Sequence, residues 1–191
     1  MRMDLDTLRE VIAQAQTGQA GGLERLLETY GRRLYGYFYR ATGDHHEAED
    51  LLAEMTLRLM RTIGGYSDQG RFEPWLFRIA CNMVRDRIRR RTSQGVTHSL
   101  SGGNDGNPLG DDLPGASEPV SLRLEQAELS QRLEQALGRL DETSRQMILL
   151  RHFGDMSFKE IADVFDCPLG TALAKVHRGL KTLRQWMGDE Q

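Results

Sequence analysis

The chain has 191 residues, of which 39% are hydrophobic and 28% charged, a globular balance that excludes a largely disordered chain. Its net charge of −3 excludes a polyelectrolyte, so any attraction to nucleic acid has to come from local clusters of Arg and Lys. The two cysteines, Cys81 and Cys167, have neither zinc-site spacing nor the pattern of a disulfide framework. No apolar run is long enough to span a bilayer. We therefore expect a cytoplasmic protein with no membrane insertion and no metal.

A change in composition divides the chain. Residues 92–119 are rich in Gly, Ser, Asn, Asp and Pro and have no helical or strand periodicity, which predicts a flexible linker. The segments on either side, residues 1–91 and 120–191, are each of a size that suits a small helical domain. The predicted fold class is all-α, with two small helical domains joined by a flexible linker and a helix-turn-helix in the second.

In the first domain, apolar periodicity predicts helices over residues 5–16, 23–41, 44–63 and 72–91. The third starts at Asp44, an N-cap residue that forms a capping-box-like pair with Glu47. The fourth separates an apolar face from a polar one. Its expected inward residues are Phe72, Trp75, Leu76, Ile79, Met83 and Ile88, and its outward residues are Arg71, Arg78, Asn82, Arg85 and Arg89.

In the second domain, helices are predicted over residues 120–140 and 141–153, with Asp141 as N-cap and Gly154 in the C′ position. Ser157 and Glu160 then form a capping box, the turn Asp166-Cys167-Pro168 follows, and a last helix covers residues 169–187. This pattern predicts a helix-turn-helix over residues 157–186. The residues expected to pack its helices together are Ile161, Ala162, Phe165, Ala172, Val176 and Leu183.

The segment from Asp141 to Trp186, with RQMILLRHF and MSFKEIADVFDCPLGTALAKVHRGLKTLR, resembles region 4 of sigma-70 family transcription initiation factors. Upstream, EAEDLLAEMTLRLMRTI and FEPWLFRIACNMVRDRIRRR resemble region 2 of the extracytoplasmic-function (ECF) subfamily. The resemblance implies a bacterial sigma factor that binds core RNA polymerase and promoter DNA, directs promoter recognition and melting, and is bound by an anti-sigma factor. It implies no small-molecule substrate, and catalysis would belong to the polymerase.

The resemblance also implies roles for particular residues. It implies that the charged face of the third helix binds the polymerase, through Glu47, Asp50, Glu54 and Arg58. The residues implied to contact the minus-ten element are Tyr66, Asp68, Asn82, Arg85, Asp86 and Arg89. The residues implied to contact the minus-thirty-five element are Thr171, Ala174, Lys175, Arg178 and Lys181. Arginine attracts phosphate and asparagine can hydrogen-bond a base edge, which suits these roles.

Several alternatives stay open. The charged stripe of the third helix is by itself more typical of a solvated face. Phe72 and Trp75 have the spacing of core residues rather than of a base-stacking surface. In the last helix, Leu173 stands where many relatives carry a basic or polar side chain, and Leu180 follows two turns later on the same stripe. This stripe is expected to pack against its own domain, to bind a regulator, or to contact thymine methyl groups.

Two other classes of protein compete with the sigma factor. One is a stand-alone helix-turn-helix regulator with a sensory N-terminal domain, and the other is an interaction protein that has lost DNA contacts. A metal site at His45, His46 and Glu49 is disfavoured, because adjacent histidines on a helix point in different directions. We also find no nucleotide-binding or hydrolase motif and therefore expect no enzyme and no cofactor.

Overall fold

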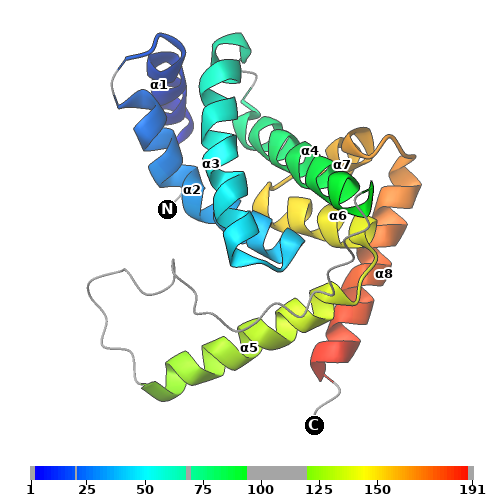
Figure 1. Ribbon diagram of the computed structural model, residues 1–191. Helices are drawn as coiled ribbons and strands as arrows, with labels where there is room; N and C mark the ends of the chain where they lie inside the picture. The colour runs from blue at the N-terminus through cyan, green and yellow to red at the C-terminus, as the bar shows by residue number, and fades with distance from the viewer. Residues whose placement is uncertain (1–2, 20, 68–69, 94–119, 189–191) are drawn as a thin grey trace.

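The computed structural model describes residues 3–19, 21–67, 70–93 and 120–188, and in these residues the protein is all-α, as predicted (Figure 1). The N-terminal module contains α1 (Leu5–Gln16), α2 (Gly22–Thr42), α3 (His45–Thr62), the short 3-10 turn η1 (Ile63–Gly65) and α4 (Phe72–Ser93). The C-terminal module contains α5 (Val120–Gly138), α6 (Glu142–Phe153), α7 (Phe158–Val164) and α8 (Leu169–Gly188). The predicted linker lies almost entirely outside the described residues. Within them, no helix is both long and apolar enough to cross a membrane.

Side-chain caps start several helices where the sequence predicts. The Asp44 carboxylate accepts a hydrogen bond from the Glu47 amide at 3.0 Å, and Ser157 and Glu160 complete the predicted capping box. The reciprocal hydrogen bond of this predicted capping box, from the Asp44 amide to the Glu47 carboxylate, is absent from the hydrogen bonds of the described residues. The carboxylate of Glu47 instead pairs with Arg91 at 2.6 Å and Arg87 at 3.5 Å, and so ties α3 to α4.

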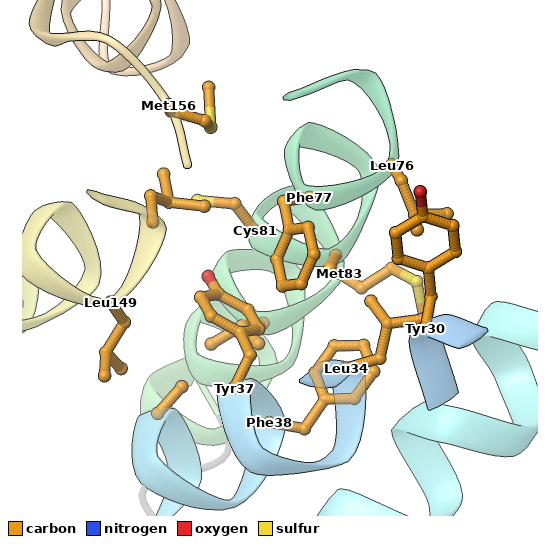
Figure 2. Packing of buried hydrophobic residues seen from close by; sticks show 14 of the residues in the cluster. Tyr30, Leu34, Tyr37, Phe38, Leu76, Phe77, Cys81, Met83, Leu149 and Met156 are labelled. Atoms are coloured by element: carbon orange, nitrogen blue, oxygen red, sulfur yellow. The ribbon is translucent and has the colours of Figure 1, made fainter. Parts of the chain in front are cut away.

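The two modules pack directly on each other, because α6 lies against both α2 and α4. Figure 2 shows Leu149 and Met156 of the C-terminal module in the same cluster as Tyr37, Phe77 and Cys81 of the N-terminal one. Those three side chains have no solvent exposure. The buried hydrophobic residues of both modules therefore form one continuous cluster.

Two glycines allow the close approach of the modules. A Cβ atom at Gly36 of α2 would lie 3.0 Å from the Phe153 ring, and one at Gly154 would lie 2.9 Å from the Phe77 Cβ atom. We predicted Gly154 in the C′ position, where a left-handed glycine is common, but its φ of −91° is one that any residue adopts. The glycine is needed for space rather than for its backbone conformation.

The burial of α4 is wider than its predicted inward face. Phe72, Leu76 and Met83 are buried as expected, whereas Trp75, Ile79 and Ile88 are half-buried. Four further hydrophobic residues are buried, because α6 covers a second side of the helix. They are Phe77, Ala80, Cys81 and Val84.

Candidate nucleic-acid interface

The helix-turn-helix consists of α7, α8 and the turn between them. Ile161 and Ala162 of α7 are buried with Ala172 and Val176 of α8, which holds the two helices together. Asp166 in the turn adopts a left-handed φ of 48°, a conformation that Asp tolerates better than most residues. The predicted motif is therefore present, and one side of α8 faces solvent.

The solvent-facing side of α8 carries most of the residues expected to contact the minus-thirty-five element. Thr171, Ala174, Arg178 and Lys181 are exposed, and Lys175 is half-buried. The leucine stripe lies on the same helix, with Leu173 41% and Leu180 40% exposed. Because both leucines remain open to solvent, the expectation that the stripe packs against its own module is wrong.

Lys175 connects the recognition helix α8 to the start of α6. Its Nζ atom lies 3.2 Å from an oxygen of Asp141, which also caps α6 by accepting from the Ser144 amide at 3.0 Å. Burial acts to raise the pKa of Asp141, but the hydrogen bonds from Ser144 and Lys175 together outweigh it and lower that pKa below 3.8. Asp141 thus fixes two elements of the module.

Replacing Asp141 with alanine should lower the free energy of unfolding by about 1 kcal/mol at neutral pH, because α6 loses its N-cap. The folded-state pKa is depressed, so the ionised carboxylate stabilises the fold above pH 3.8 and this contribution fades as the pH falls below it. Urea denaturation at pH 7 and pH 3 should show the difference between the two proteins shrinking in acid. Asp163→Ala at an exposed position inside α7 is the control. An equal loss in both variants would contradict the capping role.

The polar face of α4 carries the residues expected at the minus-ten element. Asn82, Arg85 and Arg89 are exposed, and half-buried Asp86 lies 3.2 Å from Arg89. Arg85 also reaches the C-terminal module, where it donates to the Val164 carbonyl oxygen at 3.3 Å. The structure therefore brings these residues together on one face, while Asp68 lies outside the described residues.

Tyr66 lies in the segment before α4 and packs in an aromatic cluster with Phe72 and Trp75 of that helix. The ring centroids of Tyr66 and Trp75 are 4.7 Å apart, and those of Tyr66 and Phe72 are 5.4 Å apart. Phe72 is buried, whereas Trp75 is half-buried. The core interpretation thus fits Phe72 better than Trp75.

The sequence analysis missed Gln16, which anchors the same segment. Its amide nitrogen donates to the backbone oxygens of Tyr66 at 2.6 Å and Ile63 at 3.0 Å. The contact joins the end of α1 to a segment 50 residues later. A lone glutamine at the end of a helix gives no sequence signal for such a contact.

The charged residues of α3 do not all face the same way. Asp50 and Glu54 are exposed and Arg58 is half-buried, whereas Glu47 turns toward α4. Two exposed apolar residues adjoin this charged face, Leu57 at 55% and Met60 at 58% exposure. The sequence offered a signal for them, since both lie off the buried stripe of Leu51, Met55 and Leu59.

Comparison with known proteins identifies both modules. The sigma-70 region 2 model matches residues 26–94, and the sigma-70 region 4 model matches residues 130–183. The RNA polymerase sigma factor CarQ of Myxococcus xanthus is 30% identical over 90% of this chain and 92% of its own length. The ECF sigma factor BldN of Streptomyces coelicolor is 30% identical, over 98% of this chain and 69% of its own. The ECF sigma factor SigW of Bacillus subtilis is 27% identical, over 95% and 97% respectively. The chain belongs to the ECF subfamily of sigma-70 factors.

Solved structures show the same fold as this sigma factor. CnrH, solved in complex with the cytosolic domain of CnrY, matches with a TM-score of 0.66 at 22% identity, over 98% of this chain and all of its own. The sigma factor RpoE of Bartonella quintana, solved with the anti-sigma factor NepR, matches with a TM-score of 0.65 at 20% identity, over 88% of this chain and 98% of its own.

Membership in the family assigns the general activity. The protein is a sigma factor, which directs promoter recognition by RNA polymerase, and the competing interpretation as a stand-alone regulator is not favoured. Sigma factors are known as initiation factors rather than enzymes. Among the described residues, no three His, Cys, Asp or Glu side chains are grouped to hold a metal ion.

Proposed function

We propose that three surfaces of this sigma factor divide the work of initiation. The exposed face of α3 binds core RNA polymerase, the polar face of α4 binds the minus-ten element, and α8 binds the minus-thirty-five element. The observation that carries the proposal is the pair of solvent-facing helix sides that bear cations, with Arg85 and Arg89 on α4 and Arg178 and Lys181 on α8. Cations arranged along a helix side attract the phosphates of both promoter elements.

The polymerase-binding surface centres on Asp50, Glu54 and Arg58, and Leu57 and Met60 complete it. An apolar patch bordered by charges is typical of a protein interface, because its burial stabilises the complex while the charges orient the partner. Glu47 lies on the same helix as this surface, but its carboxylate turns toward α4. Its ion pairs with Arg87 and Arg91 suit a role in fixing α3 on α4.

At the minus-ten element, we infer that Arg85 and Arg89 bind backbone phosphates while Asn82 hydrogen-bonds an exposed base edge. Asp86 orients Arg89 through their ion pair. Tyr66 and Trp75 offer aromatic surfaces on which an unstacked base can stack, and Asp68 follows Tyr66 closely in the chain. Promoter opening then follows from capture of bases that have left the duplex.

At the minus-thirty-five element, α8 enters the major groove with Thr171, Ala174, Lys175 and Arg178, and Lys181 contacts the backbone. We further propose an anti-sigma factor as a regulatory partner. The Bartonella quintana relative of the same fold was solved with its anti-sigma factor, which supports this assignment. The sigma factor itself acts in the cytoplasm, and catalysis belongs to the polymerase. We also propose that residues 1–91 and 120–191 form the two domains and that residues 92–119 form the linker between them.

Run-off transcription with core polymerase tests the proposal, and the polymerase-binding surface gives its sharpest variant. Leu57→Lys should weaken affinity for core polymerase by about tenfold, because a charge replaces an apolar contact at the interface. Promoter-dependent transcripts should decrease in parallel at limiting sigma factor.

Leu129→Lys is the matched control, since Leu129 is also helical and its 56% exposure nearly equals that of Leu57. This substitution on α5 should leave polymerase affinity unchanged. Equal losses in the two variants would assign the effect to charge rather than to α3. The absence of promoter-dependent transcripts from the unmodified protein on any genomic promoter would contradict the proposed division of roles.

A further inference from the structure

The segment between α3 and α4 presents Tyr66 directly after two exposed glycines. A Cβ atom at Gly64 or Gly65 would have no neighbour within 4 Å among the described residues. Glycine also allows the backbone more conformations than any other residue. The Tyr66 amide donates to the Ile63 carbonyl oxygen at 3.0 Å, which closes the η1 turn. The glycines contribute no packing of their own, so support for this turn has to come from other elements.

Gln16 supplies such support from α1. Its side-chain nitrogen donates to the Tyr66 carbonyl oxygen at 2.6 Å and to the Ile63 carbonyl oxygen at 3.0 Å. A carboxamide nitrogen has two N–H groups, and both are used here. Because both partners are acceptors, only the nitrogen end of the amide can face them. The Ile63 side chain is buried, so one of the two acceptors is already fixed by the core. One side chain thus bridges the two ends of the η1 turn.

The end of α1 gives Gln16 a fixed starting point. The helix packs against α2. Thr17 caps it, since its amide and its hydroxyl each donate to the Ala13 carbonyl oxygen at 3.1 Å. Gly18 then ends the helix with a left-handed φ of 70°, which glycine adopts without strain. Gln16 is therefore the last residue of a capped helix, and its side chain extends from a well-defined backbone.

Tyr66 is held on its other side by aromatic packing. Its ring centroid lies 5.4 Å from that of Phe72, which is buried, and 4.7 Å from that of Trp75. The ring is thus set against α4, while the carbonyl oxygen is set against α1. A side chain that is fixed before its partner arrives loses less conformational entropy on binding, which increases affinity. An anchored Tyr66 should therefore bind an unstacked base more tightly than a loosely held one.

We propose that Gln16 is a positioning residue for promoter opening. It holds the Ile63 and Tyr66 carbonyl oxygens and so places the Tyr66 ring where an unstacked base of the minus-ten element stacks on it. Gln16 acts through Tyr66 and need not touch DNA. The inference rests on the proposed assignment of Tyr66 to the minus-ten element, whereas the anchoring of Tyr66 by Gln16 can be measured on the free protein.

Gln16→Met removes the two N–H donors and changes little else. Methionine has a similar length and helix propensity, and it adds no charge that would alter attraction to DNA. Gln14→Met is the matched control in the same helix, because the Gln14 amide donates to Glu10 within α1, at 3.4 Å. Circular dichroism should show native helix content in both variants.

In the free protein, Trp75 reports whether the anchor holds Tyr66. The chain has two tryptophans, and Trp186→Phe in every protein compared leaves Trp75 as the only one. Without the anchor, Tyr66 should loosen from the Trp75 ring. Acrylamide should then quench Trp75 fluorescence more strongly in Gln16→Met than in the unmodified protein, and equally in Gln14→Met. Equal quenching in all three would overturn the anchor.

Holoenzyme tests the role in opening, with a forked promoter whose minus-ten element is single-stranded as the probe. Its affinity for this probe should fall about tenfold in Gln16→Met, which corresponds to about 1.4 kcal/mol, and stay unchanged in Gln14→Met. Affinity for core polymerase, and for a duplex with only the minus-thirty-five element, should stay unchanged in both variants, because Gln16 lies on neither α3 nor α8. A merely structural role would lower all three affinities, and that result would overturn the proposal.

A double-mutant cycle with Tyr66→Ala separates positioning from direct contact. If Gln16 acts through Tyr66, Gln16→Met should cause no further loss on the forked probe once the ring is absent. Additive losses would overturn the proposal, because they would place Gln16 itself on the DNA. Normal binding of the probe by Tyr66→Ala would contradict the proposed function of Tyr66 instead, and Gln16 would then be an anchor without a role in opening.

Discussion

Replacing Phe77 with alanine should lower the free energy of unfolding by about 3–5 kcal/mol, because the ring fills the centre of the shared core. Phe77 has no solvent exposure, and its ring packs edge-on against Tyr37 with centroids 5.8 Å apart. The Arg33 guanidinium lies 5.5 Å from the ring centre, and the backbone of Gly154 approaches from the C-terminal module. Alanine would leave a cavity bordered by both modules. Urea denaturation followed by circular dichroism measures the loss.

Phe158→Ala is the control for this prediction. Phe158 is also a phenylalanine in a helix, but it is half-buried and contacts its own module. The Arg151 guanidinium lies 5.5 Å from the centre of the Phe158 ring. Its loss should destabilise the protein less, because fewer buried contacts disappear. In the Phe77 variant, the free energy should fall for both modules together. A normal C-terminal module beside a destabilised N-terminal one would show that the modules do not share a core.

Phe77 also marks a limit of sequence analysis. Helical periodicity correctly placed Phe72, Leu76 and Met83 on the buried side of α4, because that pattern depends on one helix and the nearest core. It gave no reason to bury Phe77 and Cys81 on a second side. Their burial depends on α6, which follows in the chain only after the predicted linker, and no local pattern specifies such a long-range contact.

The candidate site divides in the same way. The capping box at Ser157 and Glu160 is encoded within four consecutive residues, and it was predictable together with the helix-turn-helix that follows it. The orientation of Glu47 was not predictable, because its carboxylate can either cap the start of a helix or form an ion pair. In the structure it pairs with Arg87 and Arg91 of α4. Position on a helix predicts a face but not the partner of a flexible charged side chain.

Replacing Arg178 with alanine should weaken binding of holoenzyme to its preferred promoter by about 1–3 kcal/mol, or roughly 5- to 150-fold. Arg178 is exposed on α8, and its Nε atom donates to the Ala174 carbonyl oxygen at 3.2 Å, which aligns the guanidinium along the helix. A guanidinium can bind two acceptors of a guanine edge at once. The variant should therefore lose discrimination between promoter sequences, as measured by fluorescence anisotropy on duplexes that differ in the minus-thirty-five element.

Lys181→Ala separates base contacts from phosphate contacts on the same helix. If Lys181 binds only the backbone, its loss should weaken all sequences alike and reduce the slope of affinity against salt concentration by about 1. Discrimination between sequences should stay intact. Loss of discrimination in Lys181→Ala with none in Arg178→Ala would reverse the roles we assign to the two side chains.

Leu173→Lys decides what the exposed leucine stripe contacts. A leucine that faces a thymine methyl group loses that contact on substitution, so discrimination at one base pair should fall although the added charge strengthens attraction to phosphate. A leucine that faces an anti-sigma factor should instead lose affinity for that protein and keep its promoter preference. Because Leu173 is 41% exposed, the substitution does not disrupt a core, and a change in either interaction can be assigned to the helix surface. If both interactions stayed unchanged, the hypothesis that Leu173 faces DNA or an anti-sigma factor would be wrong.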